Sequence, residues 1–380
     1  MLPVPLAFWL AAAAIFLGGG LAVGLRLGWK ELFRWPVRHI PVLLLLAFAG
    51  MVLVTYEIGR GLAIFDDFSH LNTISVMATG DIPPHFVLDP AVVYGYHHFL
   101  ELFSAQLMRV GSLMPWLAFD ASRALSFSLA VMLSGLFALR VTRSPVGGVL
   151  GGAVIAFGSG TRWLLLLFPA WLVAWMGKSI HMIGSGAGSG ATLSEALVNT
   201  WAGEGAGPVG FPFAFANGIY PAGVVQMHNA NGLAGFVVIF TLLLTFNRWR
   251  SGLGGVLSAV LLSVWGLLGE AELPAFAFGW VVVAAACLVA NWRKPRAEGS
   301  RLLFLPGSLW TWLGVMFAGG LIGLLEGGAW TDILVKQIER LAGHAALNSY
   351  QSIGFQLAWP PAVVSSHLGV LPLLDPRTLT

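Results

Sequence analysis

Long apolar runs constrain this chain more than any other feature of its sequence. A helix that crosses a bilayer needs about 20 predominantly apolar residues. The clearest runs are Leu6–Leu25, Ile40–Tyr56, Ser122–Leu139, Asn229–Phe246, Leu253–Leu268, Leu273–Ala290 and Leu309–Leu325, and a further run, Val146–Met176, is broken by FGSGTR at Phe157–Arg162. Only 10% of the 380 residues are charged, whereas a soluble domain carries roughly 25%. The sequence therefore predicts an all-α polytopic membrane protein with about 8–10 transmembrane helices.

Short basic segments separate the apolar runs and indicate how the chain is oriented. They are 26–38, Arg140 with Arg143, Arg248 with Arg250, and 293–301. Because basic residues mark the cytoplasmic side, we place these segments inside and the N-terminus outside. This orientation requires that the broken run Val146–Met176 crosses the membrane only once, because two crossings would put Arg248 and Arg250 outside. Of the acidic residues, only Glu31 and Glu298 then lie inside. This predicts acidic chemistry at the outer face; the alternative is that acids simply collect in long loops.

The chain is expected to form a single transmembrane domain, residues 1–380, with longer outer segments at 57–121, 177–228 and 326–380. The first is rich in apolar and aromatic residues and is expected to hold interfacial helices. The second is Gly-rich, and its GSGAGSG motif lacks the Lys-Ser/Thr of a phosphate-binding loop, so we expect a flexible loop. The net charge of +3 gives no reason to expect a nucleic acid partner. The lone Cys287 excludes an intrachain disulfide.

The adjacent carboxylates Asp66 and Asp67 stand near the start of the first outer segment, shortly after an apolar run. Neighbouring carboxylates repel each other, and a proton or a cation relieves the repulsion. Such a pair suits a general base or the oxygen ligands of a divalent cation such as Mg²⁺ or Mn²⁺. The alternative is that the pair caps a helix that begins near Phe68, since Asp favours the N-cap position.

Further polar residues of the first outer segment are candidates for substrate binding. His97 and Glu101 stand four positions apart and would share a face of a helix, with His98 beside them and His70 earlier in the segment. A histidine and a carboxylate on one face can relay protons or bind a transition metal. The sequence has no HExxH motif and no pair of cysteines that would support zinc. Interfacial polar groups joined by hydrogen bonds are the alternative interpretation.

Candidates for a phosphate or sugar site come from other parts of the chain. QMHNANGL puts His228 and Asn231 at the outer start of an apolar run, where helix N–H groups favour an anion; ordinary capping by Asn is the alternative. LLGEAELP puts Glu270 at the outer end of another run, and acids near membrane depth tend to be functional. Arg123 and Arg162 are outer basic residues that could pair with a phosphate.

The stretch from Ile40 to Arg140 resembles the GT-C superfamily of integral-membrane glycosyltransferases. The resemblance lies in an apolar span that leads to an outer loop opening with the acidic pair, followed by a GDIPP bend and YGYHH. It is looser through Glu272, and beyond that residue only hydropathy agrees. It implies a GT-C-like fold and transfer of a sugar from a polyprenyl-phosphate donor to an acceptor, at the outer face of a bacterial plasma membrane. In that family, an acidic residue of the first loop acts as the base or, in some branches, as a metal ligand. The resemblance implies that this role would fall to Asp66 and Asp67.

Two features depart from the family pattern. An additional span precedes the one that leads to the loop, and the chain ends at DPRTLT without further spans or a soluble C-terminal domain. They predict a shortened relative or a part of a longer chain. The implied partners are the lipid-linked donor and membrane lipids, with protein subunits if the chain is instead a non-catalytic GT-C-like scaffold. A transporter, the third hypothesis, would need ionisable residues in mid-span, which the apolar runs almost lack.

Overall fold

The computed structural model describes most of the chain, and the described part is mostly helical. The described residues are 3–27, 42–61, 67–158, 169, 171, 181–182, 191–192, 201–202, 208–209, 231–246, 252–269, 272–292, 306–343, 353–356, 362–365 and 369–372. Among them, three helices are long and apolar enough to cross a membrane: α1 (Val4–Leu27), α3 (Val42–Gly61) and α6 (Pro115–Thr142). Further apolar helices are α7 (Pro145–Phe157), α11 (Asn231–Thr245), α12 (Gly252–Ser263), α13 (Trp265–Leu268), α14 (Glu272–Trp292) and α15 (Pro306–Gly323).

Large apolar side chains cover the outside of the first two of these helices. Phe16 on α1 and Leu43 on α3 are 79% and 78% exposed. An apolar surface of this extent is unfavourable in water and marks a surface that contacts lipid or protein. The apolar helices therefore indicate that the protein associates with a membrane.

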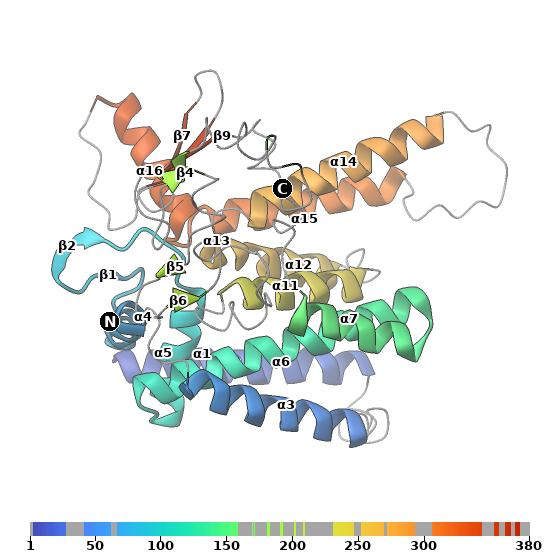
Figure 1. Ribbon diagram of the computed structural model, residues 1–380, viewed down its shortest axis with the longest axis horizontal. Helices are drawn as coiled ribbons and strands as arrows, with labels where there is room; N and C mark the ends of the chain where they lie inside the picture. Colours follow the sequence, from blue (N-terminus) through green and yellow to red (C-terminus); the bar gives the residue numbers. More distant parts are fainter. Residues whose placement is uncertain are drawn as a thin grey trace.

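The apolar helices run back and forth along the long axis of the molecule (Figure 1). We call the left end in this view the hairpin end; it holds the end of α3, the start of α6 and the start of α11. The opposite end holds the α6–α7 turn and the end of α11, where Arg140 Nη1 donates to the Leu244 carbonyl oxygen over 2.6 Å.

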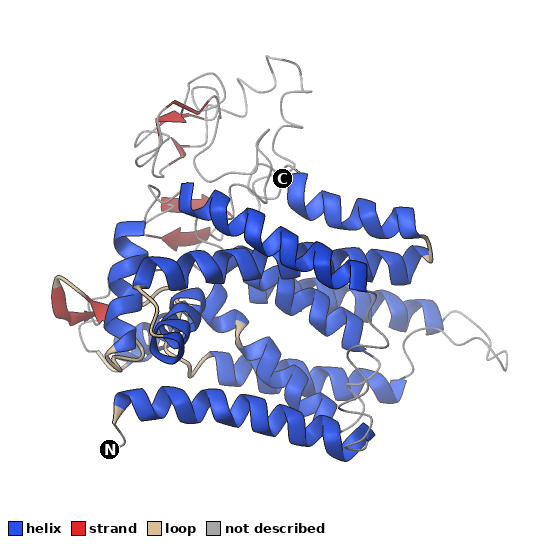
Figure 2. Cartoon of the chain, turned by 90° about the horizontal axis from the view of Figure 1, so that it is seen from below, coloured by secondary structure: helices blue, strands red, loops and turns tan. Residues whose placement is uncertain are grey.

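The first outer segment folds into two helices and a hairpin at the hairpin end. α4 (Asp67–Ala78) and α5 (Phe99–Gly111) flank the antiparallel strands β1 (His85–Phe86) and β2 (Asp89–Val93), and Figure 2 shows this hairpin projecting from the helices. Helices were expected here, but the hairpin was not. His97 and His98 also precede α5, so the expectation that His97 and Glu101 share a helix face is wrong.

Short strands also occur in segments 177–228 and 326–380, so the described part of the chain is mostly and not wholly helical. β3 (His181–Met182) pairs with β4 (Ala191–Thr192), and β5 (Trp201–Ala202) pairs with β6 (Pro208–Val209). Near the C-terminus, α16 (Ala329–Leu341) is followed by an antiparallel sheet of β7 (Ile353–Gln356), β8 (Ala362–Ser365) and β9 (Gly369–Pro372). Local pairing satisfies backbone groups that lie outside the helices.

Several helix boundaries differ from the expected spans for local reasons. α6 begins at Pro115, because proline is favoured at the first helical position, and this is earlier than the expected start at Ser122. The expected run Leu253–Leu268 is divided at Val264 into α12 and α13. α7 ends at Phe157, where the FGSGTR break was expected.

Two large apolar clusters lie among the described residues, and α11 contributes to both. The first cluster joins α1, α4, α5, α6 and α7 and includes Phe119 and Leu233. The second joins α11 to α12, α13 and α15 and includes Leu242 and Trp265. Helix α11 therefore packs against both groups of helices, and its N-terminus lies at the hairpin end.

Candidate functional site

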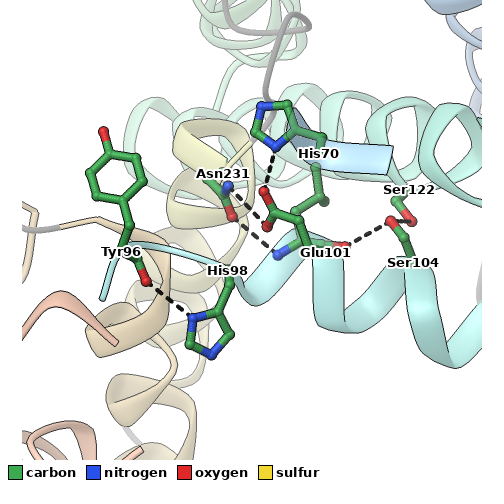
Figure 3. A network of polar contacts seen from close by, with 8 residues as sticks. His70, Tyr96, His98, Glu101, Ser104, Ser122 and Asn231 are labelled. Atoms are coloured by element: carbon green, nitrogen blue, oxygen red, sulfur yellow. Dashed lines mark hydrogen bonds and ion pairs between the residues drawn. The ribbon is translucent and has the colours of Figure 1, made fainter. Parts of the chain in front are cut away.

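A histidine and a glutamate from separate helices form a buried pair at the hairpin end (Figure 3). His70 lies on the first turn of α4 and Glu101 on the first turn of α5, and His70 Nδ1 is 2.6 Å from Glu101 Oε1. The side chains are 4% and 0% exposed. A contact this short between an imidazole and a carboxylate is typical of a charge-assisted hydrogen bond.

Asn231, the first residue of α11, also contacts Glu101. We call these three residues the His70–Glu101–Asn231 cluster. Its Nδ2 donates to Glu101 Oε2 over 3.4 Å, and its Oδ1 accepts from the Leu100 backbone N–H over 3.1 Å. His98, the N-cap residue of α5, makes no side-chain capping bond. Asn231 therefore caps α5 from another helix, whereas the sequence suggested that it binds a phosphate or a sugar, or caps its own helix.

The environment of Glu101 favours its charged form although the residue is buried. Burial raises the pKa of Glu101, but the hydrogen bond from His70 and the charges of His70 and His97 outweigh burial and hold this pKa below its usual range. The position of Glu101 in the first turn of α5 also favours a negative charge, because the helix dipole is positive there. The cluster thus holds a carboxylate that is shielded from solvent.

An aromatic ring connects the cluster to a buried arginine on α6. The His70 ring lies 5.1 Å from the ring of Phe119, and the Arg123 guanidinium lies 3.9 Å from the centre of the same ring. Arg123 is fully buried and lies 3.5 Å from Asp120 Oδ1. A cation over an aromatic face is stabilised by the ring quadrupole, so Phe119 and Asp120 together fix the charge of Arg123 near the cluster.

The segment before α5 brings two further histidines to the site. His97 and His98 are buried, and the rings of Tyr96 and His97 lie 3.7 Å apart. His98 Nδ1 is 3.1 Å from the Tyr96 carbonyl oxygen. Burial lowers the pKa of His98, although the Tyr96 carbonyl and Glu101 act in the opposite direction.

Two buried serine hydroxyl groups join α5 to α6 near the cluster. Ser104 and Ser122 are buried, and their hydroxyl oxygens lie 2.9 Å apart. Gln106 Nε2 also donates to the Phe8 carbonyl oxygen, which ties α5 to α1. These bonds hold the first turn of α5 in place and hence hold Glu101.

The described residues do not form a metal site of their own. No group of at least three His, Cys, Asp or Glu side chains in the described ranges could hold a metal ion. The expected transition-metal use of His97 and Glu101 thus lacks a third ligand among those residues.

The structure brings together many of the residues that the sequence suggested. His70, His97, His98, Glu101, Arg123 and Asn231 gather around the start of α5. Four other candidates, Asp66, Arg162, His228 and Glu270, lie outside the described residues. Asp67 begins α4, one residue before the expected start near Phe68, and its side chain also lies outside the described part.

Sequence reasoning missed the residues that support the site from α6. Phe119, Asp120 and Ser122 were not candidates, although Asp120 and Arg123 stand three positions apart, a spacing at which helix side chains pair. That spacing, inside a strongly apolar run, was the available signal. No sequence signal marked Phe119, because one phenylalanine among many is ordinary in such a chain.

Comparison with known proteins adds nothing to this geometry: no protein-family model, curated protein or solved structure matches the chain.

Proposed function

We propose that the chain is a GT-C-like integral-membrane glycosyltransferase with about 8–10 transmembrane helices. It transfers a sugar from a polyprenyl-phosphate donor to an acceptor at the outer face of the bacterial plasma membrane. The observation that carries this proposal is the His70–Glu101–Asn231 cluster at the hairpin end. A fully buried carboxylate costs stability even when it is paired, and such groups gather at functional sites.

The acidic pair supplies the base in this proposal. The acceptor hydroxyl attacks the anomeric carbon, the bond between this carbon and the phosphate oxygen breaks, and polyprenyl phosphate leaves with the bonding electrons. The carboxylate of Asp66 or Asp67 takes the hydroxyl proton, which contributes about 10²–10⁴-fold to the rate. His70 follows Asp67 by one turn of α4, so the pair and the cluster belong to one short segment. Binding of Mg²⁺ or Mn²⁺ is the alternative use of the pair.

Arg123 is the group that supports stabilisation of the leaving phosphate. Its guanidinium is fixed by Phe119 and Asp120 and is shielded from solvent. A preorganised positive charge in a dry site favours the negative charge that develops on a leaving group. Arg162 and His228 remain further candidates for the same task, and Glu270 for binding the sugar.

An apolar groove supports a donor that carries a hydrocarbon chain. A cavity of about 760 Å³ lies between α3, α6 and α7, and its lining includes Met51, Ile58, Val131 and Val149. Transfer of a hydrocarbon from water to such a lining is favourable. Ile58 lies near the end of α3 that leads to the acidic pair. We therefore assign the groove to the isoprenoid chain of the donor.

The decisive test is sugar transfer in membranes that contain the full chain and a panel of polyprenyl-phosphate-linked hexoses. We expect the double variant Asp66→Asn with Asp67→Asn to lower kcat/KM by about 10²-fold or more. Glu101→Gln should also lower kcat, because it removes the charge that orients His70 while keeping the side-chain shape. Asp89→Asn is the matched control, since Asp89 is an exposed carboxylate of the same segment.

Transfer that persists at the wild-type rate in the double Asp variant would overturn the catalytic assignment. If the purified protein does not bind a polyprenyl phosphate and instead stays bound to other membrane subunits, the scaffold hypothesis replaces it. Ion-coupled uptake into vesicles without sugar transfer would favour the transporter.

A further inference from the structure

Two buried polar atoms beside α13 have no hydrogen-bond partner among the described residues. They are His98 Nε2 and Glu326 Oε2. The great majority of buried polar groups in proteins are hydrogen-bonded, so each exception calls for an explanation such as a bound ligand. His98 is only 1% exposed, which makes its open nitrogen the more unusual of the two.

The two residues are held against the same short helix. The His98 backbone N–H donates to the Leu267 carbonyl oxygen over 2.9 Å, and Ser263 Oγ donates to Glu326 Oε1 over 2.8 Å. Ser263 precedes α13 and Leu267 lies within it, four positions later. The His98 backbone and the Glu326 carboxyl group thus contact residues four positions apart, on either side of the junction between α12 and α13.

Packing of the surrounding segments places the same stretches together. Gly328 lies so close to the Gly266 carbonyl oxygen that an added Cβ would collide with it. Tyr96 packs with Ala329 and Ile333 at the start of α16. The segment that carries His98 and the segment that carries Glu326 therefore meet across α13.

This pair is separate from the cluster that carries the proposed chemistry. In Figure 3 the His98 ring points away from the Glu101 carboxylate, on the other side of the α5 backbone. Glu326 belongs to the connection between α15 and α16, and the residue is half-buried, although its Oε2 is buried.

The protonation states of both groups restrict what can bind. Burial lowers the pKa of His98, and its Nδ1–H is used by the Tyr96 carbonyl, so Nε2 offers a lone pair. Burial raises the pKa of Glu326, against the effect of the Ser263 hydrogen bond, so this carboxyl group keeps a proton more readily than an exposed one.

A hydroxyl group is the ligand chemistry that suits these two atoms. An anion would face the lone pair of His98, and the described residues hold no group of three side chains that could bind a metal. A hydroxyl donates to Nε2, and a second hydroxyl of the same ligand can donate to the carboxyl oxygen.

We propose that His98 and Glu326 form a sugar-binding site beside α13, which takes a neutral pyranoside through its hydroxyl groups. That this sugar is the acceptor rests on the proposed glycosyltransferase function; the binding itself does not. The predicted contacts are one hydroxyl donating to His98 Nε2 and a neighbouring hydroxyl bonded to Glu326 Oε2.

The test measures binding of methyl pyranosides of glucose, mannose and galactose to the full chain in phosphatidylcholine nanodiscs, by saturation-transfer difference NMR without any donor lipid. We expect saturable binding of at least one pyranoside, with affinity lowered about tenfold in His98→Phe and in Glu326→Leu, since one lost hydrogen bond is worth about 1.4 kcal/mol. Glu326→Gln should bind within about threefold of the wild type, because an amide donates and accepts at the same place.

Matched controls separate site contacts from general effects. His85→Phe removes a partly exposed histidine of β1, and Glu57→Leu removes an exposed carboxylate of α3; both should bind like the wild type. Unchanged affinity in folded His98→Phe and Glu326→Leu would overturn the proposal. If phosphatidylglycerol nanodiscs show headgroup contact at this site while no pyranoside binds, the ligand is a lipid glycerol and the sugar assignment is wrong.

The outcome is independent of the transfer assay. Pyranoside binding requires neither the acidic pair nor a donor lipid, so a failure here leaves the proposed function standing. Conversely, a protein that never transfers sugar can still bind the pyranoside at His98 and Glu326.

Discussion

At the scale of single residues, Glu101 shows how a carboxylate is kept charged inside this protein. One of its oxygens is bonded to His70 and the other to Asn231, and its backbone lies in the first turn of α5. Each contact favours the anion, which offsets a desolvation cost that would otherwise neutralise the group. The charge is therefore a property of the assembled site and not of the residue alone.

The lowered pKa of Glu101 predicts how stability depends on pH. A carboxylate whose pKa is lower in the folded state stabilises the fold above its unfolded pKa, and this stability is lost as the pH falls through the folded value. We expect Glu101→Gln to lower the melting temperature in nanodiscs at pH 7, with the gap to the wild type narrowing below pH 4.5, the ordinary value of the group. A gap that is constant with pH would contradict the charged state.

Asn231 allows a sharper test of the same cluster. Asn231→Asp replaces the donor to Glu101 Oε2 by a second carboxylate, whereas Asn231→Ala removes both bonds and leaves the buried Leu100 N–H without its acceptor. The alanine variant should lose about 1–3 kcal/mol of stability. The aspartate variant should be less stable still at pH 7, and it should recover in acid when one carboxylate is protonated.

Denaturation of both variants over a pH series provides the measurement. Equal losses at all pH values would show that Asn231 acts through packing and not through charge. Asn72→Asp, a change of the same type at an exposed position of α4, is a control for the added charge itself.

At the scale of elements, α6 and α7 are joined by glycines. Ser134 Oγ donates to the Gly151 carbonyl oxygen over 2.9 Å, and a Cβ added at Gly135 would lie 3.0 Å from the Gly148 carbonyl oxygen. Small residues allow helices to approach closely, and the start of α7 is rich in glycine. The structure identifies α6 as the partner helix.

Gly151→Val is expected to disrupt this contact, because an added Cβ would collide with the Ala138 side chain. Overpacking of this kind costs about 1–3 kcal/mol. Gly314→Val in α15 is the matched control, since an added Cβ there meets no atom within 4 Å. Thermal denaturation of both variants in nanodiscs checks the difference, and equal melting temperatures would contradict the packing argument.

The start of α5 shows why an element can be predicted while its boundary is not. YGYHHFLELFSAQLMRVG was expected to hold a helix, and α5 occupies most of it. His97 and His98 stay outside because Asn231 caps Leu100 from α11. A cap provided by a residue 131 positions away leaves no trace in the local pattern.

At the scale of the whole molecule, the alternation of helices separates two chemically different ends. His70, His98 and Glu101 belong to the hairpin end, while Arg140 and Arg143 lie at the opposite end. If the helices cross a membrane, the two ends face opposite sides. Basic residues favour the cytoplasm for the end that holds Arg143.

Cysteine labelling in intact cells tests this sidedness. In a Cys287→Ser background, Arg143→Cys should react with an impermeant maleimide only after the cells are opened, whereas Leu88→Cys, at the 83% exposed tip of the hairpin, should react from outside. Both positions are exposed, so the contrast reports sidedness and not burial. Labelling of Arg143→Cys from outside would overturn the orientation.

The sequence by itself determined the class of protein and the candidate residues. Low charge and long apolar runs require a bilayer or a very large core, and polar residues in such a chain are few enough to be considered one by one. His70, Glu101 and Arg123 could be selected in this way, because a polar group near an apolar span is costly wherever it finally lies.

Only the tertiary structure decided which of those residues meet and what each one does. His70 and Glu101 are separated by 31 positions, and Asn231 by a further 130, so their contacts depend on how α4, α5 and α11 pack at one end of the bundle. The structure also decides that His98 Nε2 and Glu326 Oε2 are buried without a hydrogen-bond partner among the described residues. Hydrogen bonds act over about 3 Å, and distances of that size between remote residues are set by packing, which no local pattern of residues encodes.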